Sequence, residues 1–284
     1  MLERYYELTK PGIVYANALI ALATFLYASG WHFALQSLAG MLIGLALVVA
    51  SACVFNNAYD RGIDRLMART KDRALAAGTI PVARALAFGT VLGVAGFATL
   101  FLLANALSCA AALFGFAVYV LAYTPAKHRT HWSTLVGSLA GAAPVAVGYA
   151  AATGRLDLTA GLIFLALALW QMPHFYAIAL YRLEDYRKAG VPTLPLARTP
   201  RAAKRAILAY MLGFVLAECA LFAIGAAGYA YLAIALASFA FWARAALQGF
   251  ADPDDAWGRR VFLASLIALC GFALALAVSP LLAR

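Results

Sequence analysis

Three side chains that carry oxygen atoms recur every four residues in the stretch from Ser51 to Arg65. If this stretch is helical, Asn56, Asp60 and Asp64 lie on one face, because residues four apart are neighbours on a helix. Two carboxylates this close repel each other unless a cation joins them. Mg²⁺ is the simplest such cation, since it binds through a few carboxylates together with phosphate oxygens of a substrate. The spacing therefore predicts a metal site for a phosphorylated substrate; the alternative is a solvated helix end with local salt bridges.

Basic side chains follow this stripe at once, beginning with Arg61, Arg65, Lys71 and Arg73. A diphosphate bridged by a metal ion would need both kinds of residue: acidic ones to hold the metal and basic ones to neutralise the phosphates. Further basic residues stand in two later loops, at Lys127, Arg187 and Lys188. Lys127 could reach a phosphate, or could simply anchor its loop to lipid head groups.

A second group of polar and aromatic residues ends another apolar run. It contains, in order, Trp170, Gln171, Pro173, His174, Tyr181 and Asp185. Their spacing places His174, Tyr181 and Asp185 on one helix face, and Pro173 is expected to kink or open that helix. Polar groups at membrane depth face a cavity by default, and aromatic walls suit a flat aromatic ligand or a carbocation. The alternative for His174 is an ordinary hydrogen bond to a neighbouring helix.

The composition places these residues in a membrane protein. Of the 284 residues, 65% are hydrophobic and 12% are charged, whereas a soluble domain has about 25% charged residues. The apolar runs are continuous and do not alternate, so they predict helices and exclude a β-barrel. The first ten residues contain Glu3 and Glu7 and no hydrophobic core, so no cleavable signal peptide is expected.

We therefore expect an all-α polytopic membrane protein with nine transmembrane helices in one bundle, formed by residues 1–284 as a single domain. Each apolar run is close to the ~20 residues that cross a bilayer as a helix. The expected spans cover residues 12–30, 37–57, 84–104, 106–123, 133–152, 157–180, 204–225, 229–248 and 260–281.

The basic residues are distributed as nine spans require. With the N-terminus in the cytoplasm, 20 of the 22 lysines and arginines fall on the inner side, and only Arg155 and Arg284 fall outside, as the positive-inside rule predicts. Because the basic residues border membrane spans, the net charge of +10 needs no nucleic-acid partner. The two longest inner loops, 58–83 and 181–203, follow spans two and six and are expected to be catalytic. Their spacing favours a parallel internal repeat of about 10–130 and 131–250; two unrelated basic loops are the alternative.

At this point the chain resembles a known family. The Asn56-x-x-x-Asp60-x-x-x-Asp64 stripe, the nine spans and the basic loops look like the intramembrane prenyltransferases of the UbiA superfamily. Within it, four stretches look like the protohaem IX farnesyltransferases, or haem O synthases: residues 56–70, 123–127, 170–175 and 185–195. The Trp-Gln-Met-Pro-His block within 170–175 is the more specific sign, because quinone prenyltransferases usually show a second Asp-x-x-x-Asp motif there. This chain instead has Asp185 followed by Ala189.

The resemblance implies farnesyl diphosphate as the donor and haem B as the acceptor, so that haem is a substrate and not a prosthetic group. Asn56, Asp60 and Asp64 would hold Mg²⁺, with Asp185 as a candidate ligand for a second ion. The diphosphate would be neutralised by Arg61, Arg65, Lys71, Arg73, Lys127, Arg187 and Lys188. The acceptor would contact Tyr123, Trp170, Gln171, His174 and Tyr181.

In this reading Tyr59 and Tyr123 would steady an allylic cation. His174 is expected to orient haem, with His128 and His131 as the alternatives. The protein would work in the inner plasma membrane with its active site facing the cytoplasm. Its partners would be the lipid bilayer and a downstream haem-modifying enzyme or terminal-oxidase assembly. The rival hypotheses are an aromatic or quinone-precursor prenyltransferase, a transporter, and a haem-binding assembly protein without catalysis.

Overall fold

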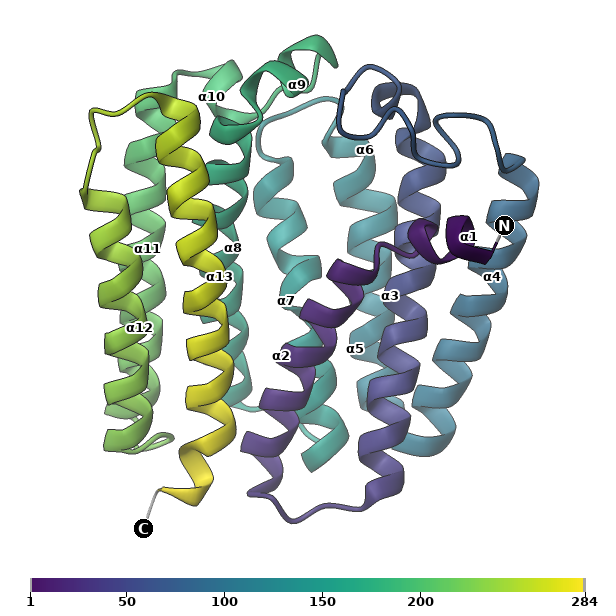
Figure 1. The fold of residues 1–284 in the computed structure, drawn as a ribbon. Coiled ribbons are helices and arrows are strands. Elements are labelled where there is room, and N and C mark those ends of the chain that lie inside the picture. Colours follow the sequence, from purple (N-terminus) through teal and green to yellow (C-terminus); the bar gives the residue numbers. More distant parts are fainter. Residues whose placement is uncertain (1, 283–284) are drawn as a thin grey trace.

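The computed structural model describes residues 2–282, which form a bundle of long helices (Figure 1). The elements are, in order, α1 Leu2–Leu8, α2 Pro11–Ser29, α3 Leu35–Asp64, α4 Val82–Thr99, η1 Leu100–Ala104, α5 Ala106–Ala117, η2 Val118–Tyr123, α6 Thr124–Ala126, α7 Ser133–Thr153, α8 Leu158–Tyr181, α9 Leu183–Lys188, α10 Leu194–Ala197, α11 Pro200–Ala223, α12 Tyr229–Leu247, α13 Asp254–Val278 and η3 Ser279–Leu281. Within the described residues, nine helices are long and apolar enough to cross a membrane. The prediction of an all-α protein with nine spans is confirmed.

The second span is longer than predicted, and this matters for the site. Helix α3 has 30 residues and ends at Asp64, whereas the expected span ended at residue 57. At 1.5 Å per residue, α3 is about 45 Å long and exceeds a hydrocarbon core of ~30 Å. Its last turns, which carry the acidic stripe, therefore reach the surface of the membrane region.

The helix boundaries follow from local capping. The third and fourth spans are separated only by Asn105, whose backbone is extended and whose side-chain oxygen accepts a hydrogen bond from Ser108 N at 2.8 Å. Asp157 caps α8 in the same way through Ala160 N at 3.1 Å. Pro173 lies inside α8, which continues as one helix from Leu158 to Tyr181. The opening of the backbone that Pro173 suggested is therefore absent.

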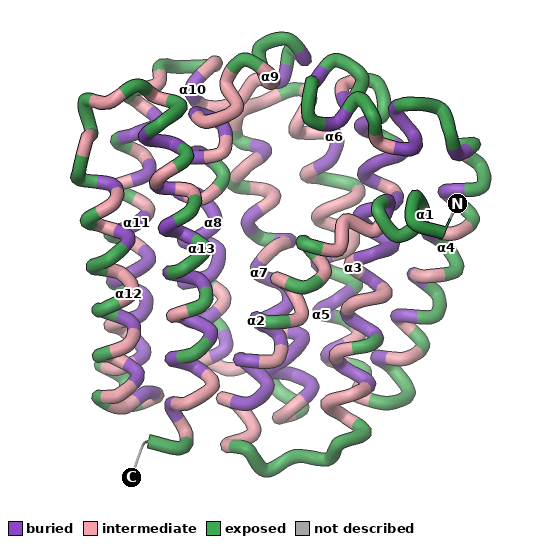
Figure 2. Tube along the Cα trace, in the orientation of Figure 1, coloured by how far each residue is buried: buried purple, intermediate pink, exposed green. Residues whose placement is uncertain are grey.

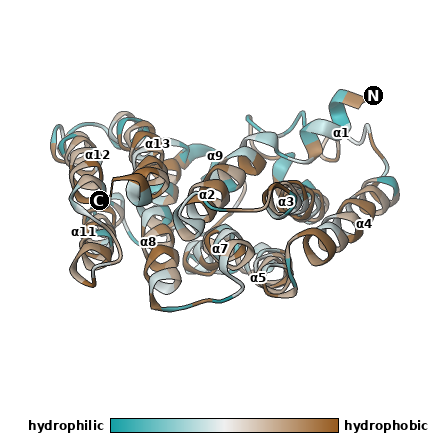
Figure 3. Cartoon of the chain, turned by 90° about the horizontal axis from the view of Figure 1, so that it is seen from below, coloured by the Kyte–Doolittle hydropathy of each residue, from teal (hydrophilic) through white to brown (hydrophobic). Residues whose placement is uncertain are grey.

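Helices α2 and α7 lie at the centre of the bundle, between α3–α5 on one side and α8 with α11–α13 on the other (Figure 3). Their close approach depends on Gly148 of α7. A Cβ atom at this position would lie 2.3 Å from the backbone oxygen of Ala21 in α2. Small residues permit such contact between membrane helices, which gain stability from packing because lipid offers no hydrophobic driving force between them.

The long connections and the short helices α6, α9 and α10 gather at one end of the bundle, here called the loop end (Figure 1). The chain after α3 is fixed there against the chain after α8. Ala68 N donates to Asp185 Oδ1 at 3.3 Å, and Met67 is buried in a small cluster with Ala189 and Val191. Buried residues also continue into these connections, although most of their length is exposed (Figure 2). The loop end is thus a packed cap over the bundle.

Candidate active site

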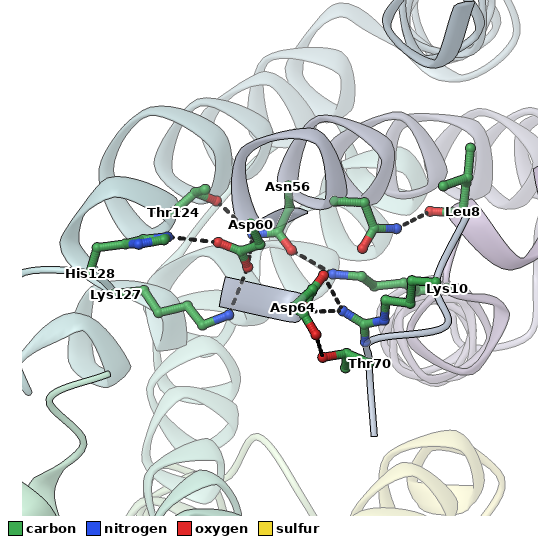
Figure 4. A network of polar contacts seen from close by, with 11 residues as sticks. Leu8, Lys10, Asn56, Asp60, Asp64, Thr70, Thr124, Lys127 and His128 are labelled. Atoms are coloured by element: carbon green, nitrogen blue, oxygen red, sulfur yellow. Dashed lines mark hydrogen bonds and ion pairs between the residues drawn. The ribbon is translucent and has the colours of Figure 1, made fainter. Parts of the chain in front are cut away.

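The acidic stripe lies on the inward face of α3 at the loop end (Figure 4). Asn56, Asp60 and Asp64 are 2%, 1% and 3% exposed, so two carboxylates are removed from water. Asn56 Nδ2 donates to Asp60 Oδ2 at 3.2 Å and to Thr124 Oγ1 at 3.0 Å. Buried carboxylates are costly unless positive groups compensate them, so the surrounding cations define the site.

Each member of the stripe has a basic partner from another segment. Asp60 accepts from Lys127 Nζ at 2.7 Å and contacts His128 Nε2 at 2.9 Å. Asp64 accepts from Arg73 Nη1, at 3.1 and 3.0 Å for its two oxygens. The segments before α7 and after α3 therefore both close over the stripe.

Lys10 is the third cation, and it comes from the residue that precedes α2. Its Nζ donates to Asn56 Oδ1 (Figure 4). Burial lowers the pKa of Lys10 to about 8. Its backbone is left-handed, with φ 51°, which is uncommon for a residue other than glycine and often marks a functional constraint. Sequence reasoning missed this residue, because a lysine before a membrane span also fits a simple topological role.

A cavity of about 640 Å³ opens beside the stripe and continues between the helices. Lys10, Asn56, Asp64 and Lys127 line it at the loop end. Its deeper wall is apolar and comes from six spans, with residues such as Ile20, Leu45, Val48, Phe116, Pro144 and Leu167. An elongated apolar molecule with an anionic head group would match this distribution of charge.

Two stacked tyrosines stand on one side of this cavity. Tyr119 and Tyr123 have ring centroids 5.2 Å apart with an interplanar angle of 27°, and both line the cavity. They come from η2, a π-helical turn, and such turns occur frequently at functional sites. Gly137 of α7 leaves room for Tyr123, because a Cβ at that position would lie 2.8 Å from the ring. Their π faces can stabilise a passing cation.

His174 lines the cavity from α8 and is held by α13. Its Nδ1 lies 2.7 Å from Ser265 Oγ, and the hydroxyl of Ser265 donates to Phe262 O at 2.5 Å. Ser265 can therefore only accept from His174, which places the ring proton on Nδ1 and leaves the lone pair on Nε2. Trp170 stacks on the imidazole at 4.7 Å between centroids. An imidazole oriented in this way can bind a metal ion carried by a ligand.

Gln171 and Tyr181, the other two residues predicted for the acceptor, also line the cavity. Gln171 Nε2 donates to Ser138 O at 3.0 Å and to Leu167 O at 3.2 Å, so its amide tethers α8 to α7. Among the residues predicted to bind the diphosphate, Arg73 and Lys127 are the two that line the cavity.

The other residues predicted to bind the diphosphate do not line this cavity. Arg61 and Arg65 donate to backbone oxygens of Ala58 and Ala76 at 2.6 Å. Arg61 directly follows Asp60, and Arg65 directly follows Asp64. A step of one residue turns a side chain by about 100° around the helix, so both arginines leave the face of the stripe. Two further predicted residues, Lys71 and Lys188, are exposed, and Arg187 pairs with Glu184 on the surface.

Asp185 and Tyr59 also do not line the cavity. Asp185 accepts from Ala68 N and does not line the cavity, so it joins two loops and stands apart from the stripe. Tyr59 is 48% exposed and contacts the ring of His128. His128 reaches Asp60 and His131 packs on Trp132, so His174 is the histidine placed along the cavity wall.

The donor set of the stripe fits a hard divalent cation. Across residues 2–282, no group of three or more His, Cys, Asp and Glu side chains forms a closed metal cage. Asn56, Asp60 and Asp64 instead offer oxygen atoms from one helix face, buried beside cations. This is the incomplete ligand set that Mg²⁺ completes with water and phosphate oxygens.

Comparison with known proteins decides the family. The model of the UbiA prenyltransferase family matches residues 17–267. The chain belongs to the UbiA prenyltransferase family. It is therefore a multi-pass membrane protein of a prenyltransferase family.

Relatives within this family are similar over almost their whole length. Protoheme IX farnesyltransferase 2 of Chromobacterium violaceum is 45% identical over 279 residues, covering 97% of this chain and 92% of the relative. A protoheme IX farnesyltransferase of Chromohalobacter salexigens is 45% identical over 280 residues, with 98% and 95% covered. The segments that carry the stripe and His174 lie within these alignments.

Solved structures share the fold. A digeranylgeranylglyceryl phosphate synthase structure matches with a TM-score of 0.80 at 18% identity, covering 98% of both chains. A UbiA homologue from Archaeoglobus fulgidus, bound to DMAPP and Mg²⁺, matches with a TM-score of 0.69 at 18% identity, covering 96% of this chain and 99% of the homologue. At these identities the likeness concerns the fold.

Proposed function

We propose that this protein transfers the farnesyl group of farnesyl diphosphate to a vinyl group of haem B and so makes haem O. The observation that carries the proposal is the cavity itself. Asn56 and Asp64 of the buried stripe line its loop end beside Lys10, Arg73 and Lys127, and its wall holds an oriented imidazole at His174. The protoheme IX farnesyltransferases that resemble the chain at 45% identity support the same donor and acceptor.

The chain's own residues divide the work. Lys10, Arg73 and Lys127 would bind the diphosphate oxygens and take up the negative charge of the leaving group. Mg²⁺, when bound by Asn56, Asp60 and Asp64, would supply further neutralisation of that charge. The apolar helices would exclude water from the allylic cation, and Tyr119 and Tyr123 would stabilise it through their π faces.

The acceptor would capture this cation. A new carbon–carbon bond forms between the first farnesyl carbon and the terminal vinyl carbon of haem B, and diphosphate leaves. Water then adds to the remaining cationic carbon and loses a proton, which gives a hydroxyethylfarnesyl side chain. His174 would orient haem through its unprotonated Nε2, with Trp170 stacked behind it.

The site would face the cytoplasm of a cell whose inner membrane holds the protein. The distribution of basic residues supports this orientation, since the loop end contains nearly all of them. A downstream haem-modifying enzyme or a terminal-oxidase assembly would receive the product. We further propose that residues 1–284 are one domain with a parallel repeat of about 10–130 and 131–250. The matching places of α3 and α8, which both end at the loop end, support the repeat.

The test is an assay of purified protein in detergent with haem B, farnesyl diphosphate and Mg²⁺. Extracted haems are analysed by mass spectrometry. We expect a haem species that is heavier by one farnesyl group and one hydroxyl group, and that is lost when EDTA removes the metal. Folded protein that makes no such haem, but prenylates an aromatic quinone precursor with the same donor, would refute haem as the acceptor.

A further inference from the structure

The loop end of the cavity carries a second group of cations that the stripe does not use. Arg69 and Arg182 both line the cavity. Within residues 2–282, neither guanidinium has an ion pair or a hydrogen bond to a side chain, and Arg182 Cζ lies 4.2 Å over the ring of Tyr181. Lys10, Arg73 and Lys127, by contrast, are all bonded to Asn56, Asp64 or Asp60. The uncommitted pair is therefore free to bind an anion.

Arg182 lies on the α8–α10 side of the cavity. His174, Ile178 and Arg182 are spaced by four residues and all line the cavity, so they follow one face of α8. The rise from His174 to Arg182 is about 12 Å at 1.5 Å per residue. Arg182 thus stands two turns above the oriented imidazole, at the end where α8 meets the loops.

The segment that carries Arg69 joins this side to the stripe, because the hydroxyl of Thr70 donates to Asp64 O at 2.9 Å. Ala68, its neighbour, donates to Asp185 of α9, and Met67 packs against Val191 in front of α10. Thr193 follows Val191 and lines the cavity as well. Its hydroxyl oxygen is buried and has no hydrogen-bond partner among residues 2–282, which is costly unless a ligand supplies one. A buried unpaired hydroxyl and two free guanidinium groups therefore meet the same end of the cavity.

Guanidinium groups bind carboxylates with two parallel hydrogen bonds, and a threonine hydroxyl can add a third. Haem has two propionate carboxylates on one edge, while its vinyl-bearing edge is apolar. We propose that Arg69, Arg182 and Thr193 form a carboxylate subsite that binds the haem propionates, apart from the diphosphate centre at Lys10, Arg73 and Lys127. Each substrate then has its anionic groups at the loop end, and the vinyl edge of haem reaches the apolar zone below the stripe. This inference rests on the proposed function.

The experiment compares haem B with its dimethyl ester, in which both propionates are neutral. Each is titrated into purified protein in detergent, and binding is followed by the Soret absorbance. The variants are Arg182→Ala, Arg69→Ala and Arg182→Lys, and Arg201→Ala is the control because Arg201 is exposed and lies outside the cavity. Loss of a charge-assisted pair should weaken haem B binding about tenfold in Arg182→Ala. Binding of the dimethyl ester should stay within about twofold of the wild type.

A second arm measures a non-hydrolysable thio analogue of farnesyl diphosphate with Mg²⁺. We expect its affinity to be the same in Arg182→Ala and in the wild type. If Arg182→Ala weakens the analogue and leaves haem B unchanged, the arginine belongs to the diphosphate centre and the inference is wrong. Equal wild-type affinities for haem B and its ester would also overturn it.

Failure of the proposed function gives a different pattern. Wild-type protein that neither binds haem B nor converts it refutes the function itself, whatever the variants do. Wild-type protein that converts haem B, with arginine variants that bind it normally, refutes only the subsite. Arg182→Lys keeps the charge but cannot form two parallel hydrogen bonds with a carboxylate. If Arg182→Ala is poorly folded, a haem B affinity of Arg182→Lys below that of the wild type supports the subsite.

Discussion

At the scale of single residues, Asp60 is the centre of the stripe because Lys127, His128 and Asn56 all meet its carboxylate. We expect Asp60→Asn to lower turnover on the order of a thousandfold, since the variant keeps the shape and loses a metal-binding charge. The measurement is haem O formation by mass spectrometry, together with thermal unfolding in detergent. Asp157→Asn, at the opposite end of the bundle, should keep its activity. Turnover like that of the wild type in Asp60→Asn would disprove a catalytic role of the stripe.

Lys10 and Lys188 make a matched pair of lysines at the loop end. Lys10 is bonded to Asn56 inside the cavity, whereas Lys188 is exposed outside it. We expect Lys10→Ala to raise the KM for farnesyl diphosphate about tenfold through the loss of one charge-assisted contact. Lys188→Ala should change it little. The reverse result would mean that the diphosphate binds outside the cavity, among the loop cations that the sequence suggested.

The hydroxyl of Ser265 fixes the proton of His174 on Nδ1. In Ser265→Ala this constraint is lost, so Nε2 carries the proton in part of the molecules and ligates haem iron less well. We expect a shifted Soret band and a changed iron spin state in the electron paramagnetic resonance spectrum of bound ferric haem. Ser265→Thr keeps the hydroxyl and should restore the wild-type spectrum. Identical spectra in all three proteins would mean that Ser265 does not set the tautomer of an iron-ligating His174.

At the scale of elements, the contact of α2 with α7 fixes one side of the cavity. It also positions Lys10, which directly precedes α2. Gly148→Ala would press a methyl group against the backbone of Ala21, which cannot move without displacing α2. Overpacking of this kind costs about 1–3 kcal/mol. We expect a lower midpoint of thermal unfolding in detergent. Gly161→Ala is the control, because within residues 2–282 no heavy atom beyond its own helix backbone and chain neighbours lies within 4 Å of its added Cβ. Equal midpoints for the two variants would refute the close contact.

At the scale of the whole molecule, nine spans place the α7–α8 connection and the α8–α10 segment on opposite sides of the membrane. In a variant without native cysteines, a cysteine at Glu184 should react with a membrane-impermeant maleimide only after the cell is opened. A cysteine at Arg155 should react in intact cells. The opposite labelling pattern would mean that the site faces away from the cytoplasm.

Much of this arrangement could be predicted from the sequence because it depends on local rules. Continuous apolar runs fix the number of spans, since each must satisfy its backbone hydrogen bonds within lipid. The four-residue spacing of Asn56, Asp60 and Asp64 fixes a common face on any helix. Both follow from positions within one segment, and the structure adds only that α3 continues through Asp64.

What the tertiary structure decided is which cations face the stripe and which face the solvent. Arg61 and Arg65 are close in sequence but turn away around α3, whereas Lys10 and Lys127 are 46 and 67 residues distant from their partners and reach them through packing. Asp185 likewise joins two loops, because the chain after α3 folds against α9. Side-chain direction and contacts between distant segments depend on how helices pack. The sequence therefore determined the membrane fold and the acidic stripe, and the packing of the bundle determined the site around them.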